Sequence, residues 1–192
     1  MIQEVIVTTC DLDGRAHVAP MGIRLHGELV VVAPFRPSVT LENLLANRCA
    51  VVNYSDDVRV FAGCLTGRTD WPLIRSERVP ADRLADSLAH TELELASVED
   101  DVVRPRLLCR PVYEATHLPF QGFNRAQASV LELAILVSRL DLLPFDKISR
   151  EIDYLKIAME KTAGAREREA WNWLMARVEA HRAGATVEAI GR

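Results

Sequence analysis

The residues best suited to binding chemistry lie in the turn Arg36-Pro37-Ser38-Val39-Thr40, which precedes a pattern typical of a short helix. The first N–H groups of a helix lack partners within it, and the helix dipole favours negative charge there. Arg36 can add a charge-assisted contact, and Ser38 and Thr40 can donate hydroxyl hydrogen bonds. The turn is therefore a candidate phosphate site. Taken alone, these residues are explained more simply by a capped helix with Arg36 in water.

A second candidate segment is Ala19-Pro20-Met21-Gly22, in the middle of a predicted strand. Glycine allows a flat ligand to approach the backbone closely, and main-chain groups beside a proline could bond the edge of a planar ring. An ordinary bulge that bends the sheet is the simpler interpretation.

The third candidate segment is Asn53-Tyr54-Ser55-Asp56-Asp57. The Asn53 amide can both donate and accept, and the two carboxylates could hold hydroxyl groups or an amine. A turn is again simpler, and no third ligand at a fixed spacing supports a metal site.

A fourth segment, Gly122 to Ala126, leads into a predicted helix. Asn124 suits the N-cap, whereas Arg125 opposes the helix dipole and is expected to have a partner elsewhere. No catalytic residue can be assigned, because the five histidines are scattered and triads assemble only in space.

Several segments read as strands, and the first three predict an antiparallel meander. Pro20 and Gly22 should make its second strand irregular, and Arg110-Pro111 should mark an edge or a bulge. The predicted strands are Glu4–Thr9, His17–Leu25, Leu29–Ala33, Cys49–Tyr54, Val58–Leu65, Leu93–Val98 and Arg106–Glu114.

Apolar residues at helical spacing predict a short helix over Leu41–Asn47 and three longer helices near the C-terminus. The longer helices are Ala126–Leu140, ended by Pro144, then Ile148–Lys161 and Glu167–Arg182, which form a hairpin near Ala163-Gly164. Trp171 and Trp173 face different sides of the last helix, so packing explains them better than a stacking platform.

Composition fits an ordinary soluble protein: 192 residues, 49% hydrophobic, 26% charged, with a net charge of −4. The charge excludes an electrostatic footprint for nucleic acid. The four cysteines have no C-x-x-C spacing, which favours buried, reduced thiols over a disulfide set or a metal site. With no apolar run long enough for a membrane and no basic, apolar leader, we expect a cytoplasmic protein.

The order and spacing of four stretches resemble the flavin reductase-like, FMN-binding split-barrel superfamily. These stretches are AHVAPMG, APFRPSVTLENL, AVVNYSDDVRVFA and GFNRAQASVLELAILVSRL, within residues 16–140. The chain is most similar to a family in that superfamily associated with tetrahydromethanopterin-linked one-carbon metabolism.

The resemblance implies a six-stranded antiparallel Greek-key split barrel, which we place over residues 1–122. With the predicted helices this gives an α+β fold, in which a C-terminal helical subdomain over residues 123–192 packs on the barrel. The resemblance also implies a homodimer with FMN at the subunit interface. By position, the implied FMN contacts are Arg36, Ser38, Thr40 and Asn43 at the phosphate, Ala19, Pro20, Met21 and Gly22 at the ring edge, and Asn53, Asp56, Asp57, Val58, Asn124 and Arg125 around the pocket.

The function expected from this resemblance is that of an FMN-dependent oxidoreductase, in which the protein binds and tunes the flavin. A small-molecule substrate or a nicotinamide reductant would be its partner, although no Rossmann glycine fingerprint is present. Two alternatives remain open: a non-catalytic FMN-binding or sensing module, and a homodimeric scaffold in one-carbon metabolism.

Overall fold

A computed structural model describes residues 1–184. These residues form two compact units. The barrel unit comprises residues 1–55 and 69–120, and the helical unit comprises residues 56–68 and 121–184. The chain therefore leaves the barrel unit twice, first for residues 56–68 and again near residue 120. The predicted packing of the helical subdomain on the barrel stays a prediction.

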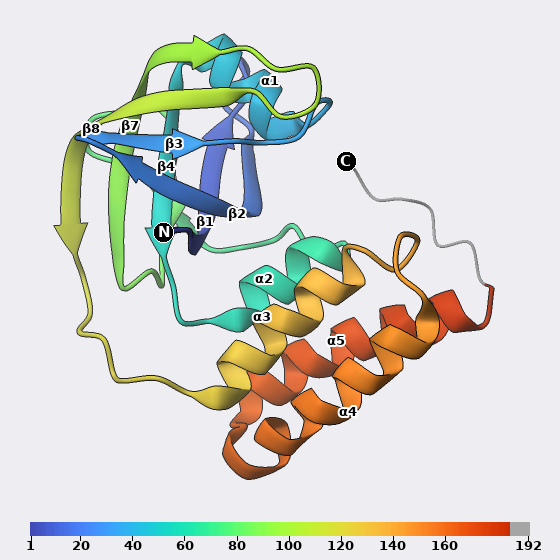
Figure 1. Cartoon of the computed structure of the whole chain (residues 1–192). Helices are drawn as coiled ribbons and strands as arrows, with labels where there is room; N and C mark the ends of the chain where they lie inside the picture. Colours follow the sequence, from blue (N-terminus) through green and yellow to red (C-terminus); the bar gives the residue numbers. More distant parts are fainter. Residues whose placement is uncertain (185–192) are drawn as a thin grey trace. The chain divides into compact units, whose positions relative to one another are not determined.

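The barrel unit is a closed, six-stranded antiparallel barrel, as predicted (Figure 1). Strands neighbour one another in the order β1-β2-β3-β8-β7-β4, so β3 pairs with β8 although β4 follows it among the barrel strands. This crossed connection is the Greek-key arrangement. The strands are β1 (Gln3–Cys10), β2 (Ala16–His26), β3 (Leu29–Val32), β4 (Cys49–Tyr54), β7 (Ala89–Glu99) and β8 (Arg106–Thr116).

Alternate residues of the strands fill the barrel because successive side chains point to opposite faces. The interior cluster takes Val5 and Val7 from β1 and Ala50 and Val52 from β4. The helix α1 (Val39–Asn47) adds Leu41 and Leu44 to this cluster and packs against β1 and β2. Figure 1 shows α1 across one end of the barrel, where it closes the core.

An irregular segment, residues 69–88, covers part of the outer barrel wall and carries a small sheet of β5 (Leu73–Ile74) and β6 (Arg83–Leu84). Buried polar side chains of the wall hold it in place. Asn53 Oδ1 accepts from the Leu84 N–H at 2.7 Å, and Thr8 Oγ1 donates to the Asp82 carbonyl. We call residues 69–88 the outer segment.

The sequence predicted that β2 would be irregular, and this is wrong for the ladder between β2 and β1. That ladder runs in unbroken register from Gln3↔Ile23 to Cys10↔Ala16. The reason lies at the other edge of β2, where β3 pairs only with Ile23–His26. Because Pro20 lies outside this second ladder, its missing N–H does not have to be accommodated between two strands. The bulge predicted at Pro111 is confirmed by a register shift between β7 and β8.

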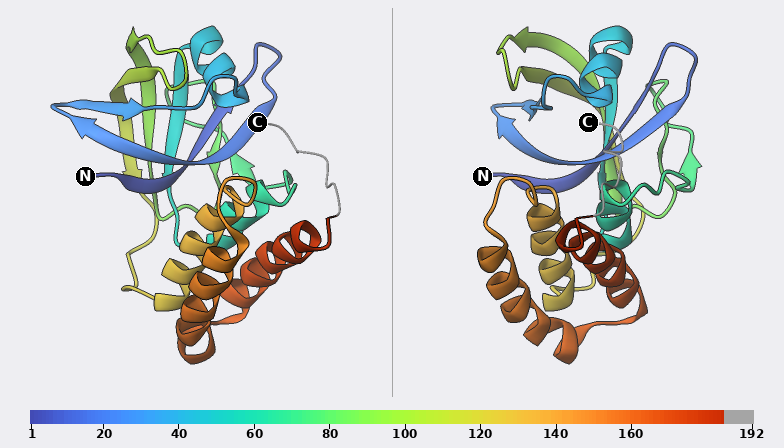
Figure 2. Two further views of the ribbon diagram at one scale, coloured as in Figure 1. Left: turned by 45° about the vertical axis from the view of Figure 1, so that its right-hand side comes forward. Right: turned by 90° about the vertical axis from the view of Figure 1, so that its right-hand side faces the viewer.

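The helical unit consists of α2 (Val58–Leu65), α3 (Arg125–Val137), α4 (Phe145–Thr162) and α5 (Ala165–Arg182), shown from two sides in Figure 2. The strand predicted over Val58–Leu65 is wrong. Val58, Ala62 and Leu65 recur at i, i+4 and i+7 and pack into the helical core. The β-branched composition of this segment concealed that period.

The other helices agree with the sequence pattern, including the hairpin of α4 and α5. Asn124 caps α3 as predicted, but α3 ends at Val137, and Pro144 precedes α4 instead of ending α3. Trp171 packs into the core of this unit, whereas Trp173 lies under the Arg68 guanidinium, 3.8 Å from the ring centroid. Within residues 1–184, no helix is long and apolar enough to cross a membrane.

Candidate functional site

The N-terminus of α1 has the groups expected of an anion site. Ser38 is the N-cap, and its hydroxyl accepts from the Leu41 N–H at 3.3 Å. Among residues 1–184, no internal hydrogen bond uses the N–H groups of Val39 or Thr40. These two donors therefore have no acceptor there, at the positive end of the helix dipole, and Val39 is exposed.

Arg36 lies beside this helix start, and its side chain is 40% exposed. Its guanidinium donates to Asp100 at 2.9 Å, while its backbone N–H bonds the Val103 carbonyl. An exposed ion pair of this kind is worth little in water. Arg36 can therefore exchange Asp100 for a more highly charged anion at small cost.

Thr40 and Asn43 are buried, with exposures of 2% and 6%. Asn43 Nδ2 donates to Thr9 Oγ1 at 3.1 Å, which ties α1 to the end of β1. These side chains are thus placed to position the helix, whereas Arg36 and Ser38 are the accessible members of the predicted set.

The predicted ring-edge segment Ala19–Gly22 is half-buried on β2. It pairs with β1 on one edge, whereas the pairs with β3 begin only at Ile23. A Cβ at position 22 would come within 2.8 Å of the Ile2 side chain, so the glycine leaves room for that residue. One edge of Ala19–Gly22 is therefore not paired with β3. The same strand, β2, is also contacted by α1.

Asn53 is fully buried, and its amide is used within the barrel. Nδ2 lies within hydrogen-bond distance of the Ile6 carbonyl and Thr8 Oγ1, both at 3.2 Å, and Oδ1 accepts from Leu84. The side chain thus holds the outer segment, and only its backbone is left to contribute to a pocket.

Asp56, Asp57 and Val58 belong to the helical unit. Asp57 is the N-cap of α2 and also pairs with the Arg59 guanidinium, its Oδ2 2.6 Å from Nη2. Burial alone would raise the pKa of Asp57, but the hydrogen bonds and charge of Arg59 outweigh it and hold that pKa below its ordinary value.

We expect Asp57→Ala to lower the free energy of unfolding by about 1–3 kcal/mol, because α2 loses its cap and Arg59 is left with its longer ion pair with Glu169. Urea denaturation followed by circular dichroism measures the loss. Asp56→Ala is the neighbouring control, and an equal effect of both variants would contradict this assignment.

Asn124 and Arg125 begin α3, also in the helical unit. Asn124 Oδ1 accepts from the Ala126 N–H at 2.7 Å, and Nδ2 donates to the Thr162 carbonyl. Arg125 is exposed. The contacts with FMN expected of Asp56, Asp57, Val58, Asn124 and Arg125 stay predictions.

A buried polar array on β7 was not predicted. Glu92 is fully buried and accepts from the N–H groups of Glu77, Arg78 and Val79 at 2.7–2.9 Å. Glu92 Oε1 also lies 3.3 Å from His90 Nε2. His90 and Glu92 are two apart, on one face of a strand, and this spacing was the signal available in the sequence.

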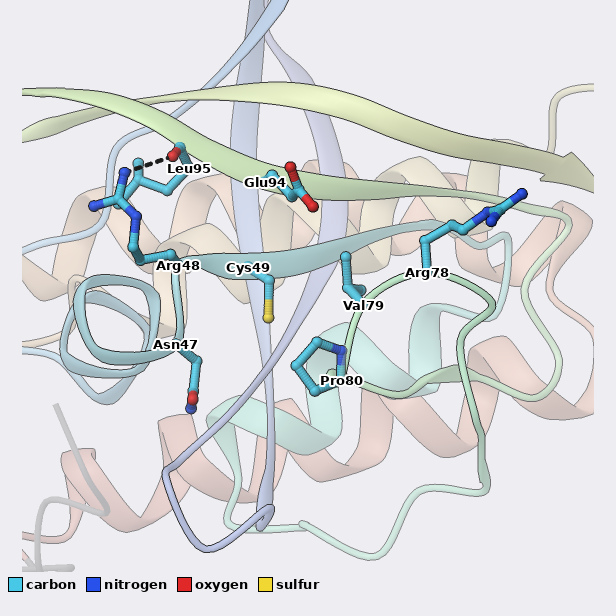
Figure 3. Close-up of a pocket in the computed structure, with 8 residues that line it drawn as sticks. All are labelled: Asn47, Arg48, Cys49, Arg78, Val79, Pro80, Glu94 and Leu95. Atoms are coloured by element: carbon cyan, nitrogen blue, oxygen red, sulfur yellow. Dashed lines mark hydrogen bonds between the residues drawn. The ribbon is translucent and has the colours of Figure 1, made fainter.

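Figure 3 shows a pocket of about 210 Å³ in the barrel unit. Cys49 Sγ points toward the side on which Asn47 and Pro80 lie, and the Arg48 guanidinium turns to the Leu95 carbonyl. This volume is below that of ordinary cofactor sites, and no predicted FMN residue lines the pocket. Within the described residues, no group of three or more His, Cys, Asp or Glu side chains could hold a metal ion.

Comparison with protein families gives two matches. Residues 3–117 match the model described as "Protein of unknown function (DUF447) N-terminal domain", and residues 124–176 match the model described as "Protein of unknown function (DUF447)". The chain belongs to the DUF447 family. The gap between the two matches of this DUF447 chain coincides with its second departure from the barrel, near residue 120. Comparison with curated proteins found no match.

Solved structures share the fold of this DUF447 protein. An FMN-bound DUF447 protein from Methanosarcina mazei has a TM-score of 0.79 and 21% identity, over 92% of this chain and 94% of that one. A flavin reductase with a split-barrel domain from Shewanella frigidimarina, described as putative, has a TM-score of 0.55 and 13% identity, over 66% of this chain and 75% of that one.

A third match is an FMN-binding protein from Thermus thermophilus, with a TM-score of 0.52 and 17% identity, over 59% of this chain and 69% of that one. Together these matches confirm the predicted likeness to the flavin reductase-like split barrel. The link to tetrahydromethanopterin stays a prediction.

Proposed function

We propose that this protein binds FMN and that its phosphate is held at the N-terminus of α1. The observation that carries the proposal is the convergence there of Arg36, the Ser38 cap and the N–H groups of Val39 and Thr40. A phosphate dianion suits these donors, because charge-assisted hydrogen bonds are stronger than neutral ones. The FMN-bound DUF447 structure supports the choice of ligand.

In this proposal, the ring edge bonds main-chain groups of Ala19–Gly22, whose outer edge is not covered by β3. Asn43 acts indirectly by fixing α1 against β1, and the Thr40 side chain is buried. When bound, the flavin supplies the electron-transfer chemistry. The protein's own residues bind the phosphate, orient the ring and exclude water from one of its faces.

We infer further that the protein acts as a homodimer with this site at the interface. Phe35, Val102 and Val103 are exposed apolar side chains close to Arg36. Arg104 lies over the Phe35 ring and donates to the Ala33 carbonyl, so the loop after β7 and the segment before α1 form one surface. An exposed apolar patch of this kind is typical of an interaction site. A monomer by light scattering would contradict this inference.

The test of the function has two steps. Protein purified without added cofactor should show a flavin absorption spectrum, or should bind added FMN with saturable quenching of flavin fluorescence. The loaded protein should then oxidise a nicotinamide reductant with saturation kinetics. Binding without turnover would leave an FMN-binding module, and absence of binding would overturn the proposal.

A further inference from the structure

Three side chains of the barrel unit form a line from its wall to its surface. Glu92 Oε1 lies 3.3 Å from His90 Nε2, and His90 Nδ1 lies 2.9 Å from His117 Nε2. Glu92 and His90 are buried, whereas His117, just after β8, is exposed. The two imidazole planes are 11° apart with centroids separated by 5.0 Å. This separation fits an in-line N–H···N hydrogen bond better than a face-to-face stack.

The surroundings of Glu92 determine the protonation state of its carboxyl group and, through it, the tautomers of the two histidines. Burial alone would raise the pKa of this carboxyl, but three backbone N–H donors and His90 outweigh burial and hold the pKa below its ordinary value. Glu92 is therefore ionised at neutral pH and can only accept hydrogen bonds.

An ionised Glu92 requires a proton on His90 Nε2. The Nδ1 atom of a neutral His90 must then accept, so His117 must donate from Nε2–H. The remaining nitrogen of His117, Nδ1, is left with a lone pair.

We propose that Glu92, His90 and His117 form a proton relay, with His117 Nδ1 as a general base for a ligand that carries a weakly acidic O–H or N–H group. Glu92 and His90 are positioning residues, because they fix the tautomer of His117. This site is separate from the proposed flavin site, and the two sites share no residue.

The charged and aromatic groups around the relay suit this role. His90 lies beside Tyr113 of β8, with ring centroids 5.7 Å apart. Partial burial and the nearby charge of Arg83 on β6 lower the pKa of His117. His117 is therefore neutral at pH 7, and the Arg83 guanidinium can stabilise the anion that forms.

In the proposed step, a proton moves from the ligand to His117. The ligand's O–H or N–H bond breaks, its electron pair stays on the ligand as an anion, and the proton joins His117 Nδ1. The resulting imidazolium keeps its Nε2–H bond to His90 and is stabilised by the Glu92 carboxylate behind it. No electron acceptor is needed.

The direct test is the tautomer of His117 in the unmodified protein, read from ¹⁵N imidazole chemical shifts between pH 5 and 9. We expect His90 and His117 both to carry Nε2–H at neutral pH, and His117 to titrate below the ordinary pKa of a histidine. Assignment of the proton to His117 Nδ1, or a mixture of the two neutral tautomers, would overturn the proposal.

A second test uses diethyl pyrocarbonate, which reacts with a neutral imidazole lone pair. At pH 6, mass spectrometry should show His117 modified faster than the histidine of an unstructured peptide added as an internal standard, because more of His117 is neutral. His90→Gln should slow the modification of His117 and leave that of His26 unchanged. If the variant does not fold, the tautomer of His117 in the unmodified protein still decides the matter. Modification of His117 no faster than that of the peptide histidine would count against the relay.

Discussion

Replacement of Glu92 by glutamine is expected to lower the free energy of unfolding by about 2–4 kcal/mol. The carboxylate accepts from three consecutive backbone N–H groups of the outer segment. A glutamine amide keeps one acceptor oxygen and turns an NH₂ group toward the other donors. At least one buried N–H group then has no acceptor, and a buried donor without a partner is costly.

Urea denaturation at pH 7 measures this loss, and Glu94→Gln is the matched control. Glu94 lies two residues further along β7 and is exposed, so its substitution should change stability by less than about 0.5 kcal/mol. Equal stability of the two variants would show that the carboxylate does not hold the outer segment.

The same contact predicts a pH dependence. The folded-state pKa of Glu92 lies below its ordinary value, so the folded protein binds this proton less readily than the unfolded chain. The stability that Glu92 contributes is therefore complete above the unfolded pKa of about 4.3 and is lost as pH falls through the folded pKa. The difference between the unmodified protein and Glu92→Gln should shrink below pH 4. A difference that grows on acidification would contradict this account.

Replacement of Arg36 by alanine is expected to weaken FMN binding by roughly tenfold, the effect of losing one charge-assisted hydrogen bond at a partly exposed site. The fold should be unaffected, because the only side-chain ion pair that Arg36 makes within residues 1–184 is the exposed one with Asp100. Titration with FMN, followed by fluorescence quenching, measures the change.

Arg106→Ala is the matched control for Arg36→Ala. Arg106 also makes an exposed ion pair, with Glu99 at 2.7 Å, but it lies on β8 and not at a helix start. Its loss should leave FMN affinity unchanged. Equal weakening by both variants would point to the general charge of the protein instead of a phosphate contact.

The parts of this structure that sequence could predict are those fixed by local interactions. Ser38 and the apolar spacing of Leu41 and Leu44 predict α1 because capping and helical period both act within one or two turns. Asn124 predicts the start of α3 for the same reason. The meander of β1 to β3 follows from short turns between β-branched runs.

Features that depend on distant contacts were missed. Val58–Leu65 resembles a strand by composition, and only the helical core shows why α2 forms there. The regularity of β2 depends on where β3 ends, which local sequence does not specify. The partners of Glu92 come from residues 77–79, and His117 is 27 positions from His90. Such pairings arise only when the barrel closes.

At the candidate phosphate site, the sequence predicted the helix start but not which of its atoms are accessible. Thr40 and Asn43 are buried, and the amide of Asn53 is used by the barrel, whereas Arg36 and Ser38 remain within reach of a ligand. Exposure is a property of the packed molecule and cannot be predicted from local sequence. The proposed phosphate contacts are therefore limited to Arg36, Ser38 and the first N–H groups of α1.

The most direct test of the central claim compares the affinities for FMN and riboflavin, which differ only in the phosphate. We expect the unmodified protein to prefer FMN, and Arg36→Ala to remove most of this preference while leaving riboflavin affinity unchanged. Equal affinity for both flavins in the unmodified protein, or an unchanged preference for FMN in Arg36→Ala, would contradict a phosphate site formed by Arg36 at the start of α1.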